Sequence, residues 1–111
     1  MQQGEIYLVR FPFTDLTSTK LRPALLISND SFNKFENCMF IGVFGNKGNP
    51  CYSLPLENTS LSEGKLNKTS FIRFQNTFSL HKSLIVQKVA SLKPEELKKI
   101  SEKLSSFTCV N

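Results

Sequence analysis

Apolar residues along this chain gather in short runs separated by polar, turn-prone stretches, a pattern typical of β-strands. Residues 5–11 are rich in β-branched and aromatic side chains and predict a strand, which Pro12 ends or places at a sheet edge. The run from Pro23 to Ser28 is too short for a buried helix and predicts a central strand. Further strands are expected at 38–44, 52–56 (an edge strand, because it contains Pro55), 70–75 and 84–89.

The segments between these strands predict loops and one closing helix. Residues 14–21, 45–50 and 57–67 are polar and read as loops, and a turn at 29–31 leads into one helical turn that ends near Phe35. A helix is expected after Lys93, with proline at its first position and two acids in its first turn. Its apolar stripe is Leu97, Ile100 and Leu104.

These elements indicate a mainly β fold with a C-terminal helix, in which five or six short strands form a small, strongly bent barrel. With 111 residues, no linker and no repeat, the chain is expected to form one domain, 1–111. Strict alternation in the strand 70–75 would place Phe71, Arg73 and Gln75 on one face and Ile72 and Phe74 on the other.

Charge is divided unevenly along the chain. Residues 1–63 carry five Lys or Arg against six Asp or Glu, whereas residues 64–111 carry nine against three. A basic half favours a polyanionic or acidic protein partner, and it is equally typical of a solvated surface. Three cysteines without metal-ligand spacing, no signal-peptide pattern and no membrane-length apolar run predict free thiols, a cytoplasmic protein, and no metal or cofactor.

Several sequence blocks resemble the MazF/PemK (Kid) toxins of type II toxin–antitoxin systems. They are 4–7, 11–16, 22–30, 66–73, 83–85 and the helix after Lys93 and Pro94, and they cover nearly the whole chain in the expected order. The resemblance implies an SH3-like small β-barrel of the MazF/PemK/CcdB type that works as a homodimer. It implies an mRNA interferase that cuts single-stranded RNA without a metal, a cognate antitoxin, and DNA contact only through the antitoxin complex.

RNA cleavage by the ribose 2′-OH needs stabilisation of phosphorane charge and two proton transfers. Arg22, at the start of the central strand, suits the first task because a guanidinium offers parallel donors to a phosphate. Its alternative role is an ion pair with Asp15 or Asp30. Arg73 matches an arginine that lies in the active site of PemK-type toxins, and an exposed position on the strand is its alternative.

The chain departs from the family at residues with chemical roles. MazF toxins follow the third strand with a hydroxyl pair that includes a catalytic threonine, whereas this chain has Gly45 and Asn46. Gln75 stands where PemK-type toxins carry an aspartate, and it does not titrate. His81, the only histidine, is a candidate general acid or base that is expected at a turn.

Other residues are candidates for holding RNA rather than cleaving it. Lys20 and Lys47 would contact phosphates, Asn46 would donate a hydrogen bond, and Phe13 would stack on a base. Thr14 and Ser18, in the first loop, complete the expected RNA-binding set, although such residues also serve simply as a soluble loop.

Four functions remain open from the sequence: an active endoribonuclease, a weakened family member that binds antitoxin or nucleic acid, a CcdB-like gyrase poison, and a generic SH3-like binding module. The gyrase poisons act through a Trp-containing C-terminal end, and this chain has no Trp.

Overall fold

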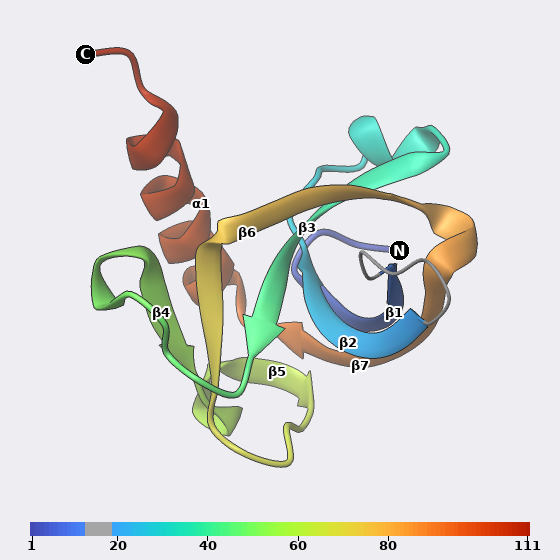
Figure 1. The fold of residues 1–111 in the computed structure, drawn as a ribbon, viewed down its shortest axis with the longest axis horizontal. Coiled ribbons are helices and arrows are strands. Elements are labelled where there is room, and N and C mark those ends of the chain that lie inside the picture. The colour runs from blue at the N-terminus through green and yellow to red at the C-terminus, as the bar shows by residue number, and fades with distance from the viewer. Residues whose placement is uncertain (13–18) are drawn as a thin grey trace.

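Seven antiparallel strands form one curled sheet in the computed structural model, which describes residues 1–12 and 19–111 (Figure 1). The strands are β1 Glu5–Pro12, β2 Thr19–Leu26, β3 Asn37–Phe44, β4 Ser53–Leu56, β5 Leu61–Gly64, β6 Ser70–His81 and β7 Ile85–Leu92. Their order across the sheet is β4-β6-β3-β2-β1-β7-β5, so β4 and β5 are its edges. Helix α1 spans Pro94–Thr108, and single 3₁₀ turns lie at Phe32–Lys34 (η1), Pro50–Tyr52 (η2), Asn58–Ser60 (η3) and Lys82–Leu84 (η4).

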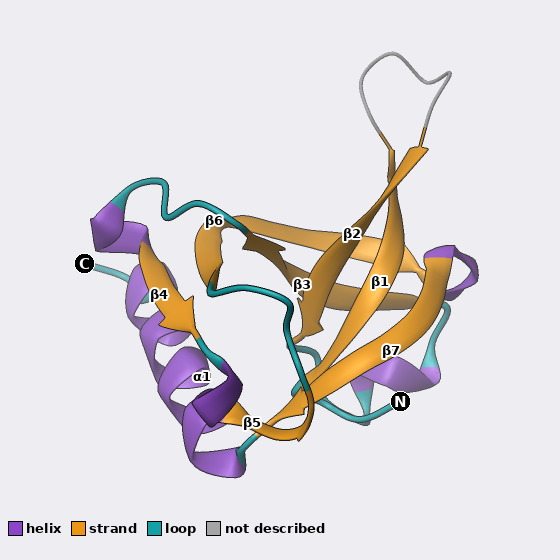
Figure 2. Cartoon of the chain, turned by 90° about the horizontal axis from the view of Figure 1, so that it is seen from below, coloured by secondary structure: helices purple, strands orange, loops and turns teal. Residues whose placement is uncertain are grey.

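The central strands bury side chains on both faces, which explains their continuous apolar runs. On one face Ile6, Leu25 and Ile41 join a core with Ile100 of α1. On the other face the curled sheet closes over a second core, whose members are Tyr7, Val9, Ala24, Leu26, Cys38, Phe40 and Leu80. Figure 2 shows α1 beside β4, against the outer side of the curl.

Strand β6 turns a corner in the middle of its length. It pairs with β3 through Ile41↔Thr77 and Val43↔Ile72, so two steps along β3 correspond to five along β6. The three extra residues break the alternation of side chains, and Figure 1 shows β6 changing direction sharply there. Because of the bend, β6 belongs to two parts of the sheet. Its first half lies between β3 and β4, and its second half pairs with β3.

The structure confirms a mainly β fold with a C-terminal helix, the helical turn before Phe35 and the edge strand that contains Pro55. All three cysteines are free thiols. Several predicted bounds are wrong. Strand β2 begins at Thr19, inside the predicted loop 14–21, and ends at Leu26 rather than Ser28. The predicted loop 57–67 contains β5, and β6 and β7 continue to His81 and Leu92. Backbone pairing extends β2 and β6 through segments that mix polar and apolar residues.

A buried carboxylate ties the start of β1 to β7 and β5. Glu5 accepts hydrogen bonds from the Tyr7 hydroxyl and the Gln2 N–H, and its second oxygen lies 2.8 Å from Lys88 Nζ. Lys88 also pairs with Glu63 at 2.8 Å. Burial alone would raise the pKa of Glu5, but hydrogen bonds from Lys88, Tyr7 and Gln2 lower it to about 2.

We expect Glu5→Gln to destabilise the fold in a pH-dependent way. A carboxyl group whose pKa falls on folding stabilises the fold above its unfolded pKa, here near 4.5, and this contribution disappears as pH falls towards 2. The loss should therefore be largest above pH 5, at most about 3 kcal/mol, and should vanish near pH 2. Urea unfolding from pH 7 to pH 2 measures it. The control is Glu63→Gln, which removes an exposed partner of the same lysine and should cost at most about 1 kcal/mol. Equal losses for Glu5→Gln at all pH values would contradict the prediction.

Candidate functional site

A small pocket of about 160 Å³ opens between β1, β2, β3 and β6. It is lined by Phe11, Arg22, Pro23, Gly42, Val43, Phe44, Asn76 and Phe78. Six of these residues are apolar, and Arg22 and Asn76 are the polar ones among the described residues of the lining. An apolar concavity with a few convergent polar groups is the usual form of a ligand site.

Strand register explains why Arg22 lies at this pocket. Strand β2 pairs with β3 only from Ala24↔Gly42 to Leu26↔Phe40. The ladder stops beside Pro23, which has no N–H to donate to it, so the two strands diverge beyond this point. Arg22 and Phe44 each lie two residues past the last pair, on the same face, and they border the space that opens.

Gly42 leaves room for the aromatic ring that forms one wall. A Cβ atom at this position would lie 2.5 Å from Cε2 of Phe44, closer than van der Waals contact allows. Phe44 is half-buried, and its ring lies over Gly42. It fills the space that a larger residue at position 42 would need for its side chain. On the opposite wall Phe78 packs edge-on against Phe11, with ring centroids 5.0 Å apart.

A second cationic group lies against the same phenyl ring. The Arg73 guanidinium is 4.4 Å from the centre of the Phe44 ring, and its Nη1 donates to Asn46 Oδ1 at 3.1 Å. The loop passes close to it at Gly48, whose positive φ of 65° and lack of a side chain permit the approach. Phe44 therefore contacts Arg73 and lines the Arg22 pocket at once.

These cations are not neutralised within the described part of the chain. Neither Arg22 nor Arg73 forms an ion pair with a described carboxylate, and the expected partner Asp30 is not paired with Arg22. Lys68 adds a third cation near the end of β3. Its Nζ lies close to Gly45, at 2.8 Å from where a Cβ atom on that glycine would be. Uncompensated positive charge around an aromatic pocket attracts an anionic ligand with flat groups.

Several predicted binding residues lie beside this cluster. Asn46 holds Arg73, and Lys20 lies opposite Phe11 in the β1–β2 pairing, exposed to solvent. Lys47 is exposed in the loop after β3. The predicted residues Phe13, Thr14 and Ser18 lie outside the described residues.

Gln75, the residue expected to act together with Arg73, does not line the Arg22 pocket. It borders a hollow with Tyr52, Phe74 and Phe107 beside α1. Asn76, the next residue, points into the Arg22 pocket instead.

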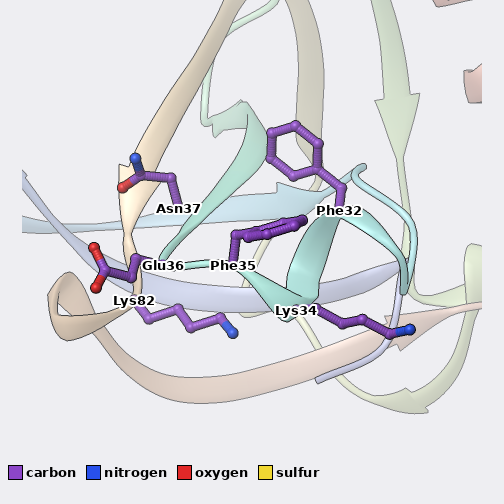
Figure 3. Close-up of a pocket in the computed structure, with 6 residues that line it drawn as sticks. All are labelled: Phe32, Lys34, Phe35, Glu36, Asn37 and Lys82. Carbon is purple, nitrogen blue, oxygen red and sulfur yellow. The ribbon is translucent and has the colours of Figure 1, made fainter.

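His81 ends β6 at the opposite end of β3, where it pairs with Asn37 and caps η4 by accepting the Ser83 N–H. Its Nε2 lies 3.8 Å from Oε2 of Glu36. Glu36 borders the separate hollow drawn in Figure 3. That hollow has a volume of about 670 Å³ and is lined by Phe32, Lys34, Phe35, Glu36, Asn37 and Lys82. Gly42 is five steps along extended β3 from Asn37, a distance of about 16 Å, so His81 does not reach the Arg22 pocket.

The sequence reasoning missed Asn76, Gly42 and Lys68. Alternation counted from Arg73 points to Gln75, and the extra residues that shift the pattern to Asn76 leave no signal in the sequence. Ser53, a hydroxyl residue that could replace the missing threonine, pairs with Arg73 across β4 and β6 rather than lining the Arg22 pocket. Its Oγ is buried and has no hydrogen-bond partner among the described residues.

Comparison with known families settles the relationship of the chain. The profile of the family described as PemK-like, MazF-like toxin of type II toxin–antitoxin system matches residues 2–108. The chain belongs to this toxin family. No curated protein sequence matches it significantly.

Solved structures agree with the PemK/MazF assignment in fold. A MazE–MazF complex from Deinococcus radiodurans superposes with a TM-score of 0.75 at 19% identity, covering 96% of this chain and 94% of that one. An endoribonuclease in complex with its cognate antitoxin, from a mycobacterial species, gives 0.72 at 16% identity, covering 96% and 90%. The Mycobacterium tuberculosis toxin MazF-mt6 gives 0.69 at 16% identity, covering 92% and 93%.

Two further observations concern the described residues of this PemK/MazF-family chain. They contain no group of three or more His, Cys, Asp or Glu side chains arranged to hold a metal ion. No helix among them combines the length and the apolar character required to cross a bilayer.

We expect Gly42→Ala to disturb the pocket while Gly45→Ala does not. At Gly42 the added methyl group collides with the partly buried Phe44 ring, and overpacking of this kind costs about 1–3 kcal/mol. At Gly45 it meets only the end of the flexible Lys68 side chain, which can move aside. Urea unfolding of both variants measures the difference. Equal stability of the two variants would show that Phe44 is not held against Gly42.

Proposed function

We propose that this chain is the toxin of a type II toxin–antitoxin pair and cleaves single-stranded RNA without a metal. The observation that carries the proposal is Arg22 at an aromatic pocket, together with Arg73 on the ring of Phe44, which lines that pocket. Neither arginine forms an ion pair with a described carboxylate. Membership of the PemK/MazF family supports it, because solved structures of the same fold include endoribonucleases.

In the proposed reaction the ribose 2′-OH attacks the neighbouring phosphorus and the 5′-oxygen of the next nucleotide leaves. The products are a 2′,3′-cyclic phosphate and a 5′-hydroxyl. Arg22 would donate to the phosphate oxygens and stabilise the charge that builds up on them. Arg73, held by Asn46 and Phe44, would position a neighbouring phosphate.

Proton transfer distinguishes this proposal from its alternative. Among the described residues, the pocket lining contains no carboxylate, histidine or lysine, and Gly45 has no hydroxyl at the position where the family resemblance implies one. The lining therefore provides charge stabilisation and positioning but no acid–base pair. This favours the second candidate function, a weakened family member that binds RNA or antitoxin and cleaves slowly.

The proposed partners are a cognate antitoxin, single-stranded RNA and a second copy of the chain. The similar solved structures include an endoribonuclease in complex with its cognate antitoxin and MazE–MazF complexes. The basic C-terminal half would attract an acidic antitoxin segment, and contact with DNA would occur only through that complex. We place the reaction in the cytoplasm, where mRNA is the substrate.

Incubation of the purified protein with a long single-stranded RNA, in the presence of a chelator, tests the function. We expect discrete fragments that end in 2′,3′-cyclic phosphate. Arg22→Ala should slow their formation about 100-fold or more, because it removes the main stabiliser of the phosphorane charge. The matched control is Arg10→Ala, an exposed arginine that faces away from Arg22 on the neighbouring strand.

Equal rates for the Arg22→Ala variant and the unaltered chain would refute the role of Arg22. Intact RNA at high protein concentration, together with tight RNA or antitoxin binding, would establish the binding module instead. Loss of cleavage on addition of chelator would show that a metal takes part.

A further inference from the structure

The ammonium group of Lys68 lies in the space where a side chain at position 45 would begin. A Cβ atom on Gly45 would be 2.8 Å from Lys68 Nζ and 3.0 Å from its Cε, so the lysine occupies this space because residue 45 has no side chain. Lys68 comes from the segment that leads into β6, and it forms no ion pair with a described carboxylate. An uncompensated cation therefore lies at the end of β3.

Gly45 relates this lysine to the two arginines of the site. It comes directly after Phe44 in the chain. The ring of Phe44 lines the pocket that Arg22 borders, and it lies 4.4 Å from the Arg73 guanidinium. The Lys68 ammonium therefore lies at the rim of the proposed phosphate site, one residue beyond its lining.

The three cations differ in whether they can release a proton. A guanidinium stays protonated in proteins, so Arg22 and Arg73 can donate hydrogen bonds to a phosphate but cannot supply a proton to it. An ammonium group can release one, and lysine is among the side chains that serve as general acids and bases. Lys68 thus offers the proton-transfer chemistry that the described lining of the Arg22 pocket lacks.

We propose that Lys68 is the proton donor to the leaving 5′-oxygen and takes the place of the hydroxyl group that Gly45 lacks. This role rests on the proposed function. As the 2′-oxygen bonds to phosphorus, its proton passes to water and the bond between phosphorus and the 5′-oxygen breaks. The Lys68 ammonium gives a proton to the 5′-oxygen, and the resulting amine takes a proton back from water.

Two short RNA substrates of one sequence separate proton donation from charge stabilisation. They contain a site mapped first on a long RNA, and they differ in whether oxygen or sulfur occupies the 5′ position of the cleaved bond. A thiolate leaves without a proton donor. We expect Lys68→Ala to slow cleavage of the oxygen substrate about 100-fold and that of the sulfur substrate less than about threefold. Arg22→Ala should slow both, because both transition states carry charge on the phosphate oxygens.

A second variant separates proton donation from a simple phosphate contact. Lys68→Arg keeps the positive charge but not the transferable proton, so it should bind 2′-O-methylated RNA as the unaltered chain does and still cleave the oxygen substrate at least about tenfold more slowly. The matched control is Lys65→Ala, which removes another exposed lysine of the same segment and should leave both rates unchanged. Lys68 is exposed, so its replacement should preserve the fold, and thermal unfolding checks this.

The possible outcomes separate the role of Lys68 from the proposed function. Unchanged cleavage of the oxygen substrate by Lys68→Ala would refute the proton donor and leave the proposed function standing. Equal slowing of both substrates, or full activity of Lys68→Arg, would also overturn it and make Lys68 a phosphate contact. If the unaltered chain cleaves no long RNA, both the proposed cleavage and the role of Lys68 in it are wrong.

Discussion

The corner in β6 is the constraint on which the rest of the structure depends. Three extra residues between Ile72 and Thr77 let the strand leave its pairing with one end of β3 and rejoin it at the other. The sheet can then curl around a second core while its edge strand β4 remains available to α1. The same corner turns Arg73, Gln75 and Asn76 towards three different surroundings.

The pocket exists because pairing between two central strands ends early. Pro23 cannot continue the ladder with β3, and Gly42 has no side chain to fill the space that results. Phe44 occupies part of it, and its ring contacts Arg73 and lines the pocket that Arg22 also borders. The backbone is paired with β3 on one side of Ala24 and diverges from it on the other, so a permanent charge lies at the boundary of a packed core. This arrangement suits the proposed role of Arg22 in positioning a phosphate.

The cations of this molecule differ in whether a carboxylate compensates their charge. A compensated cation stabilises the fold, whereas an uncompensated one remains available to a ligand. Lys88 lies between Glu5 and Glu63, and its charge is compensated by carboxylates that join three strands. Arg22 and Arg73 have no such partner among the described residues, and Arg73 is held only by an amide and a phenyl ring. Leaving these charges uncompensated forgoes ion-pair stabilisation but keeps them available to an anionic ligand.

The sequence alone determined the class of fold, the C-terminal helix and the family, because these depend on local patterns: apolar runs, proline and acids at a helix start, and contiguous motifs. It also singled out Arg22, which the structure places at the pocket. It did not determine β5 or the full length of β6. Strand β5 has four residues and a single buried apolar side chain, and the corner in β6 interrupts the alternation before Phe78 and Leu80.

Only the tertiary structure decided which amide faces Arg22. Alternation along one strand pointed to Gln75, and a three-residue irregularity, set by how β6 must bend to close the sheet, placed Asn76 there instead. His81 was separated from the pocket by the length of β3, a distance that no local pattern contains. The residues of a site on several strands are fixed by register and curvature, and both are properties of the whole sheet.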